Sequence, residues 1–279
     1  PPASGVLLGN GALLDDRWAS FLKIQGFKVG ISIDGPEHIH DHHRANVGGG
    51  GSFKTVMRGI ERCRKEGIDA GAIAVVTAYS SQFSDEMYDF FLHSGFRKLS
   101  LNPAFETDQD GKLCEFSVSD EQFGVFSERL LRRWLEDDDP GFEIRQFTEP
   151  LRGMLGGSSS ACVFAGNCKM FLDIHPNGDV RPCHSIRGEA PVFGNLRQHR
   201  IAEILTRENY QQFVAHAERL PADCLSCRWL PICHGGCTDH RNAMIDGKMQ
   251  EKYVYCGARK RTFTMLRERV TAFAGESGA

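Results

Sequence analysis

Eight cysteines in the second half of the chain constrain its fold more than any other feature. They are Cys162, Cys168, Cys183, Cys224, Cys227, Cys233, Cys237 and Cys256. Disulfide-rich chains are usually short and secreted, whereas this one has 279 residues with a hydrophobic fraction of 41%. The spacing therefore predicts loops that ligate a metal or a cluster, and two sites of four thiolates each would use all eight cysteines.

The number of ligands does not distinguish two structural zinc sites from two [4Fe-4S] clusters, because both take four thiolates in a near-tetrahedral array. The loose spacings favour clusters, since ligands from separate loops readily bind a wide cluster. Gly235 and Gly236 fit this interpretation, because glycine lets backbone N–H groups approach cluster sulfides closely. The other two cysteines, Cys63 and Cys114, are predicted to be ordinary thiols, with Cys63 in the core face of a helix.

The first half of the chain alternates short apolar runs with amphipathic stretches, a pattern typical of repeated βα units around a parallel sheet. Glycines end the amphipathic stretches, and Ser52, Ser84 and Ser119 stand where helices begin; Gln122 completes a capping box with Ser119. The predicted helices are 18–26, 52–67, 84–95 and 117–139, and the predicted strands are 27–34, 68–77 and 97–105.

The regular alternation stops after residue 140. Residues 141–161 read as a connector, Asn177-Gly178 predicts a β-hairpin, and residues 258–273 predict a basic helix. With 33 basic and 36 acidic residues the net charge is −3, and no apolar run approaches the roughly 20 residues that span a bilayer. We therefore expect neither a nucleic-acid nor a membrane partner, and a cytoplasmic location.

The late cysteines, with Gly178 among them, resemble the SPASM extension of radical S-adenosylmethionine (SAM) enzymes, in particular anaerobic sulfatase-maturing enzymes and related peptide maturases. The resemblance implies two auxiliary [4Fe-4S] clusters in this extension. The first cluster would take Cys162, Cys168, Cys183 and Cys237, and the second would take Cys224, Cys227, Cys233 and Cys256. Cys237 would then join the two halves of the extension.

Residues 9–44 are similar to the part of the sulfatase-maturing group that contains the third and fourth barrel strands. The resemblance implies SAM contacts at Ser32, Arg44 and Phe105, at or just beyond the ends of predicted strands. It also implies an α/β fold: the C-terminal portion of a partial (β/α)6 TIM-like barrel, then a small cysteine-rich domain with a hairpin and irregular loops. The expected limits are 1–145 for the barrel, 146–161 for a linker, and 162–279 for the SPASM domain with its C-terminal helix.

Two features depart from the family pattern. The Cys-x3-Cys-x2-Cys loop that binds the SAM-cleaving cluster is not in this sequence, so we expect a fragment that is inactive alone, with a third [4Fe-4S] cluster only in the full-length protein. His184 follows Cys183, where sulfatase maturases have an aspartate that is thought to take the substrate proton. A histidine near neutral pKa can also accept a proton, which makes His184 the catalytic candidate.

The resemblance implies an oxidoreductase in which a SAM-derived radical takes hydrogen from a peptide or protein side chain. The substrate would be a sulfatase, whose cysteine or serine becomes formylglycine, or a ribosomal precursor peptide that is crosslinked. An electron donor such as flavodoxin or ferredoxin would be needed. The alternatives are a non-catalytic iron-sulfur protein for electron transfer or scaffolding, and a zinc-stapled binding module.

Overall fold

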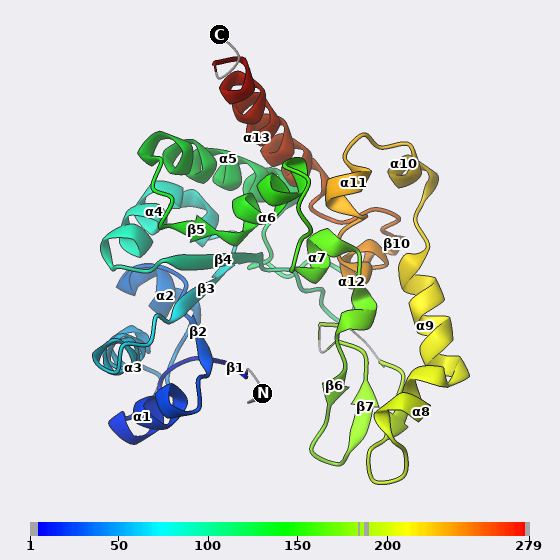
Figure 1. Ribbon diagram of the computed structural model, residues 1–279, viewed down its shortest axis with the longest axis horizontal. Helices are drawn as coiled ribbons and strands as arrows, with labels where there is room; N and C mark the ends of the chain where they lie inside the picture. The colour runs from blue at the N-terminus through cyan, green and yellow to red at the C-terminus, as the bar shows by residue number, and fades with distance from the viewer. Residues whose placement is uncertain (1–4, 184, 187–189, 277–279) are drawn as a thin grey trace. The chain divides into compact units, whose positions relative to one another are not determined.

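The computed structural model describes residues 5–183, 185–186 and 190–276 (Figure 1). Internal contacts divide the chain into two compact units. The sheet unit contains the chain up to Asp108, residues 113–148, and the chain from Gly257 onward. The cysteine unit contains residues 109–112 and Glu149–Cys256.

The sheet unit is built on five parallel strands whose spatial order follows their order in the chain. The strands are β1 (Val6–Gly9), β2 (Lys28–Ser32), β3 (Gly71–Val76), β4 (Lys98–Pro103) and β5 (Glu143–Ile144). The helices between them are α1 (Asp16–Ile24), α2 (Glu37–His43), α3 (Phe53–Lys65), α4 (Ser84–His93) and α5 (Asp120–Asp137). A 3-10 turn, η1 (Ser80–Gln82), precedes α4. Figure 1 shows the strands side by side with helices along their outer side. The predicted βα alternation is confirmed.

Local capping explains where these helices begin. The Asp15 side chain accepts the Trp18 N–H at 2.8 Å at the start of α1. The capping box at α5 is confirmed, because Ser119 Oγ accepts the Gln122 N–H at 3.1 Å and the Gln122 side chain accepts the Ser119 N–H at 3.0 Å. Ser52 stands at the N-cap of α3 as predicted, but its side chain makes no capping hydrogen bond. That hydroxyl has other partners, described below.

The cysteine unit consists of short elements, three of which form a small antiparallel sheet, β6 (Asp173–Ile174), β7 (Asp179–Arg181) and β8 (Gly194–Asn195). The predicted hairpin at Asn177-Gly178 is confirmed: β6 pairs with β7, and Gly178 has φ +91°. The remaining elements of the chain are α6 (Arg145–Met154), α7 (Cys162–Ala165), η2 (Cys168–Met170), α8 (Ile201–Thr206), α9 (Glu208–Glu218), α10 (Ala222–Leu225), α11 (Leu230–Cys233), α12 (Thr238–Arg241), β9 (Met244–Ile245), β10 (Lys248–Met249) and α13 (Cys256–Glu276). Helices α6 and α13 extend from one unit into the other.

The boundaries between the two compact units differ from the expected domain limits, and those limits remain a prediction. Residues 146–154 of the expected linker lie in α6, and Pro150 lies inside this helix, although proline in a sequence argues against a helix. Most of α13 belongs to the sheet unit, because Asp120 at the start of α5 accepts the N–H groups of Gly257 and Ala258 at 3.1 and 2.9 Å. A carboxylate at a helix N-terminus is favourable, and this one joins segments far apart in the sequence.

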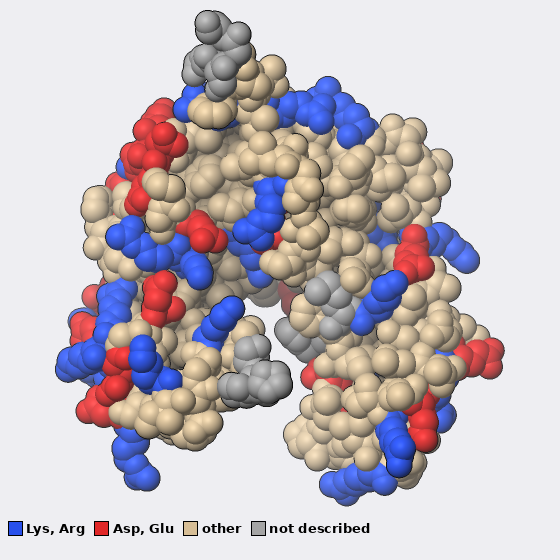
Figure 2. All heavy atoms as spheres, in the orientation of Figure 1, with Lys and Arg blue, Asp and Glu red and all other residues tan. Residues whose placement is uncertain are grey.

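The described helices include none that is long and apolar enough to cross a membrane. Figure 2 shows basic and acidic side chains intermixed over the face that it presents. This distribution matches the nearly balanced formal charge of the sequence.

Candidate cofactor edge and cysteine sites

The residues assigned to SAM by resemblance follow parallel strands at one edge of the sheet. Ser32 is the last residue of β2, Arg44 caps the end of α2, and Phe105 lies just beyond β4. The carboxyl ends of parallel strands share one edge, and barrel and open α/β folds bind ligands there. Ser32 is partly exposed, whereas Phe105 is only 9% exposed. The three positions thus lie at the edge where a ligand is expected.

A buried carboxylate fixes the Arg44 guanidinium. Arg44 Nε donates to Asp34 Oδ2 at 2.5 Å, and Arg44 Nη2 donates to Asp34 Oδ1 at 3.1 Å, a two-point contact that sets the plane of the guanidinium. Asp34 Oδ1 also accepts the Val75 N–H of β3 at 2.9 Å. The Asp34 side chain is 8% exposed and that of Arg44 is 27% exposed. The arginine therefore remains partly open at the edge while the buried acid orients it.

His40 holds the backbone on both sides of this ion pair. Its Nδ1 accepts the Asp34 N–H at 3.2 Å, and its Nε2 lies 2.9 Å from Ser52 Oγ. Burial lowers the pKa of His40, so the ring is neutral and carries its proton on Nε2, which donates to Ser52. The Ser52 hydroxyl then donates to the Arg44 carbonyl at 3.0 Å. This chain of bonds is why Ser52 does not cap α3.

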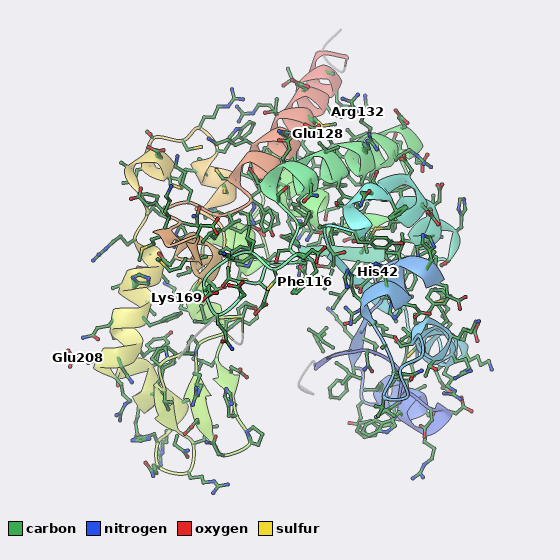
Figure 3. The ribbon with its side chains drawn as sticks, turned by 180° about the vertical axis from the view of Figure 1, so that it is seen from behind. His42, Phe116, Glu128, Arg132, Lys169 and Glu208 are labelled. Atoms are coloured by element: carbon green, nitrogen blue, oxygen red, sulfur yellow. The ribbon has the colours of Figure 1, made fainter. Side chains whose placement is uncertain are left out.

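Aromatic rings gather at the same edge of the sheet unit. His42 stacks on Tyr79, which follows β3, with 3.7 Å between ring centroids and 9° between planes. His43 presents its ring to Phe116 at 6.3 Å. Figure 3 shows His42 on α2 and Phe116 on the segment between β4 and α5. Sequence analysis missed this cluster, although the histidine-rich run at 38–43 was its signal.

The ten cysteines are divided between the two compact units. The part of the chain that the structure describes includes all ten, and no disulfide joins any of them. Cys63 is buried on α3, and burial raises the pKa of its thiol; Cys114 also lies in the sheet unit. The other eight lie in the cysteine unit.

One group of thiols surrounds Cys224. Burial raises the pKa of the Cys224 thiol, and the nearby Cys233 and Cys227 thiols act in the same direction. The ion pair with Asp223 raises the pKa of Lys252, and the Cys256 and Cys224 thiols contribute to this rise. All four cysteines assigned to the second cluster are therefore linked electrostatically, directly or through Lys252.

A second group includes Cys168 and Cys237. Burial raises the pKa of Cys237 to about 11, the backbone N–H groups of His240 and Asp239 donate to its sulfur, and the Cys168 thiol is a further electrostatic neighbour. Cys168 Sγ lies 2.9 Å from Thr238 Oγ1. In the same part of the unit, Cys183 Sγ accepts the Ser185 N–H at 3.5 Å.

The loops of the second group are packed closely. A Cβ atom on Gly166 would lie 2.6 Å from the Cβ atom of His234, so the segment after Cys162 contacts the loop between Cys233 and Cys237. Gly235 and Gly236 have φ values of +80° and +73°. A Cβ atom on Gly236 would lie 2.6 Å from the Tyr253 ring. Conformation and packing therefore require these glycines, whatever their expected role beside a cluster.

The arrangement of donors fits thiolate ligands to an iron-sulfur cluster. Backbone N–H groups that point at ligating sulfurs stabilise their negative charge and tune the potential of a cluster, and Cys237 and Cys183 both receive such bonds. Within the described residues, no three His, Cys, Asp or Glu side chains come together tightly enough to hold a single metal ion. The catalytic candidate His184 lies outside the described residues.

Comparisons with known proteins agree with this reading. The family model of the SPASM iron-sulfur cluster-binding domain matches residues 162–228. The chain is 31% identical over 265 residues to the serine-type anaerobic sulfatase-maturating enzyme of Bacteroides thetaiotaomicron, covering 89% of this chain and 64% of that protein. It is 29% identical over 260 residues to the cysteine-type anaerobic sulfatase-maturating enzyme of Clostridium perfringens, covering 91% of this chain and 69% of that protein. The chain thus spans about two thirds of the length of these relatives.

Solved structures show the same likeness. Native anSMEcpe with bound AdoMet and Cp18Cys peptide matches with a TM-score of 0.87 and 26% identity, over 98% of this chain and 76% of that one. Streptococcus suis SuiB bound to S-adenosylmethionine matches with a TM-score of 0.59 and 15% identity, over 89% of this chain and 59% of that one, and shares the fold.

The family model and the solved structures make the chain similar to radical SAM proteins with a SPASM domain. Within this class the chain is similar to the anaerobic sulfatase-maturating enzymes. The expected fold, a partial α/β barrel followed by a SPASM domain, is confirmed.

Proposed function

We propose that this chain supplies the SAM-binding edge and two auxiliary [4Fe-4S] sites of an enzyme that oxidises a cysteine or serine side chain of a sulfatase to formylglycine. The observation that carries the proposal is the likeness to both serine-type and cysteine-type sulfatase-maturating enzymes over about nine tenths of the chain. The likeness extends to a structure that contains both AdoMet and a peptide. A cytoplasmic location, where thiols stay reduced, is part of the proposal.

Arg44 is the residue of the sheet unit that the structure best prepares for SAM. Asp34 orients its guanidinium, and the neutral His40 ring and Ser52 hold the backbone at either end of that pair. An arginine fixed in this way binds a carboxylate or hydroxyl group with little loss of side-chain freedom. Ser32 and Phe105, at the same edge, complete the proposed contact set.

The proposed ligand sets follow the two groups of thiols. The neighbours of Cys224 support a cluster on Cys224, Cys227, Cys233 and Cys256. The proximity of Cys168 to Cys237, and the packing of Gly166 on His234, support a cluster on Cys162, Cys168, Cys183 and Cys237. In this assignment Cys237 ties the two loops together.

The contact set of Ser32, Arg44 and Phe105 would hold SAM, and the two cysteine sets would hold the clusters. Bound there, these groups would supply hydrogen-atom abstraction from the substrate side chain and a path for the second electron. His184, beside Cys183, is the proposed acceptor of the substrate proton. The proposal requires a Cys-x3-Cys-x2-Cys loop, which this sequence does not contain, to hold the SAM-cleaving cluster, and flavodoxin or ferredoxin is the proposed electron donor.

The test is anaerobic reconstitution of the full-length protein, with its Cys-x3-Cys-x2-Cys loop, using iron and sulfide, followed by incubation with SAM, a reductant and sulfatase peptides. Matched peptides carry cysteine, serine or alanine at the target position, and mass spectrometry with aldehyde capture detects formylglycine. This chain is expected to bind about eight irons in two four-iron clusters, in addition to any iron at the SAM site. A protein that binds zinc and no sulfide would support the zinc-stapled binding module instead. Full loading without turnover of any peptide would favour the non-catalytic iron-sulfur protein, and a crosslinked product would favour the ribosomal-peptide substrate.

A further inference from the structure

A buried arginine lies between the two groups of thiols. Arg241, at the end of α12, is 3% exposed. Its guanidinium donates to the Ala217 carbonyl at 2.6 Å, to the Gly235 and Gly236 carbonyls at 3.1 and 3.4 Å, and to Thr238 Oγ1 at 3.3 Å. These bonds hold the loop that carries both glycines against α9 and α12.

Every one of these acceptors is electrically neutral. Among the described residues, no aspartate or glutamate forms an ion pair with Arg241, although arginine stays protonated in proteins. A buried charge without a countercharge costs several kcal/mol, so buried arginines are normally paired. The fold therefore keeps a cation in the interior whose countercharge is not a carboxylate.

Ligating cysteine thiolates can supply this countercharge. Thr238 Oγ1, which accepts from Arg241, lies 2.9 Å from Cys168 Sγ, in the group that includes Cys168 and Cys237. Cys237, of the same group, is the N-cap residue of α12. The Gly235 and Gly236 carbonyls, which also accept from Arg241, lie in the loop between Cys233 of the Cys224 group and Cys237. One cation thus reaches both proposed ligand sets.

We propose that Arg241 is a positioning residue whose charge balances the thiolate-ligated clusters and raises their reduction potentials. The inference rests on the proposed iron-sulfur sites. A fixed cation in a low-dielectric interior favours the more negative, reduced form of a cluster, so its removal lowers the midpoint potential. The hydrogen bonds of the same side chain order the loop between Cys233 and Thr238.

The experiment compares four variants of the reconstituted protein. Arg241→Gln and Arg241→Met remove the charge, and Arg241→Lys keeps the charge but loses the planar set of donors. Arg228→Met is the matched control, because Arg228 lies in the same cysteine-rich segment but is exposed over the Trp229 ring at 4.6 Å. Iron and sulfide content is measured first, and midpoint potentials then come from a redox titration followed by electron paramagnetic resonance.

We expect Arg241→Gln and Arg241→Met to shift at least one auxiliary midpoint to lower potential, with Arg241→Lys and Arg228→Met close to the parent. Neutral variants that load fully at the parent potential overturn the proposal. If the neutral variants do not load, Arg241→Lys decides: loading at the parent potential supports the role of the charge, and failure to load shows that the donor geometry alone is needed. A parent protein that binds no iron and sulfide contradicts the proposed function itself, whatever these variants do.

Discussion

Substitution of Glu149 tests how the segment before Cys162 is held in place. Its side chain on α6 is 7% exposed and accepts four hydrogen bonds. Oε2 accepts from Ser159 Oγ at 2.5 Å and from the Ser160 N–H at 2.8 Å, and Oε1 accepts from Ser160 Oγ at 3.1 Å and from Arg152 at 3.5 Å. These bonds fix the segment just before Cys162. Glu149→Gln is therefore expected to loosen the first cysteine loop.

The magnitude follows from the type of bonds lost. A hydrogen bond to a charged group contributes about 1.5–3 kcal/mol, and a glutamine in the same place turns one acceptor into an N–H₂ group that faces existing donors. We expect Glu149→Gln to lower the free energy of unfolding of the cysteine unit by about 2–4 kcal/mol. The control is Glu251→Gln, an exposed position in the same unit, where a change within about 0.5 kcal/mol is expected.

Low pH should remove the stability that ionised Glu149 contributes. Burial opposes ionisation of Glu149, but the hydrogen bonds from Ser159 and Ser160 outweigh it, so the folded-state pKa lies below the ordinary value for a glutamate. The carboxylate therefore stabilises the fold fully above the unfolded-state pKa, and this contribution is lost as the pH falls through the folded-state value. Urea unfolding at pH 7 and at several points below pH 4.5 measures both effects. A Glu149→Gln variant with the parent stability and the parent acid profile would refute the reasoning.

Two other changes test the two proposed sites. Asp34→Ala leaves the Arg44 guanidinium without its acceptors and should weaken SAM binding by about 10-fold or more, which corresponds to about 1.4 kcal/mol in calorimetry; unchanged affinity would mean that Arg44 does not contact SAM in this way. Cys237→Ala should lower the iron content and increase hydrogen exchange in residues 162–183 as well as in its own loop. A response in the later cysteine loops alone would show that the ligand sets are paired differently.

Local signals predicted most of the sheet unit. Ser119 and Gln122 are close in sequence, so their capping box could be predicted from four residues, and the Asn177-Gly178 turn could be predicted in the same way. The N-terminal cap of α13 could not, because its acceptor is Asp120, in a helix more than a hundred residues earlier. Helix α6 was missed because residues 141–161 read as a connector. Pro150 also argues against a helix locally, but Phe147 and Glu149 on α6 are buried, and such tertiary packing overrides local preference.

In the candidate sites, too, the sequence indicated some residues and missed others. Ligand type and spacing indicated the eight cysteines, since the chemistry of a thiolate is a property of the residue itself. The residues proposed to orient the candidate ligands were not found, because a buried Asp34 or Arg241 resembles a surface charge until its burial is known. A sequence motif indicates which residues can bind a ligand, whereas the fold shows which other residues hold those side chains in place.

Iron should contribute unequally to the order of the cysteine unit. Helices α7, α10, α11 and α12 have one turn each, and isolated helices shorter than about 12 residues are marginal in water, so ligands and packing must hold them. The sheet of β6 to β8 instead packs with α8 and α9 over an apolar core of Val180, Phe193, Ile204 and Tyr210. Removal of iron with a chelator should raise hydrogen exchange in the cysteine-bearing turns and leave that core protected. Equal loss of protection in both regions would mean that the clusters support the whole unit, because the apolar core would then be too weak to fold without them.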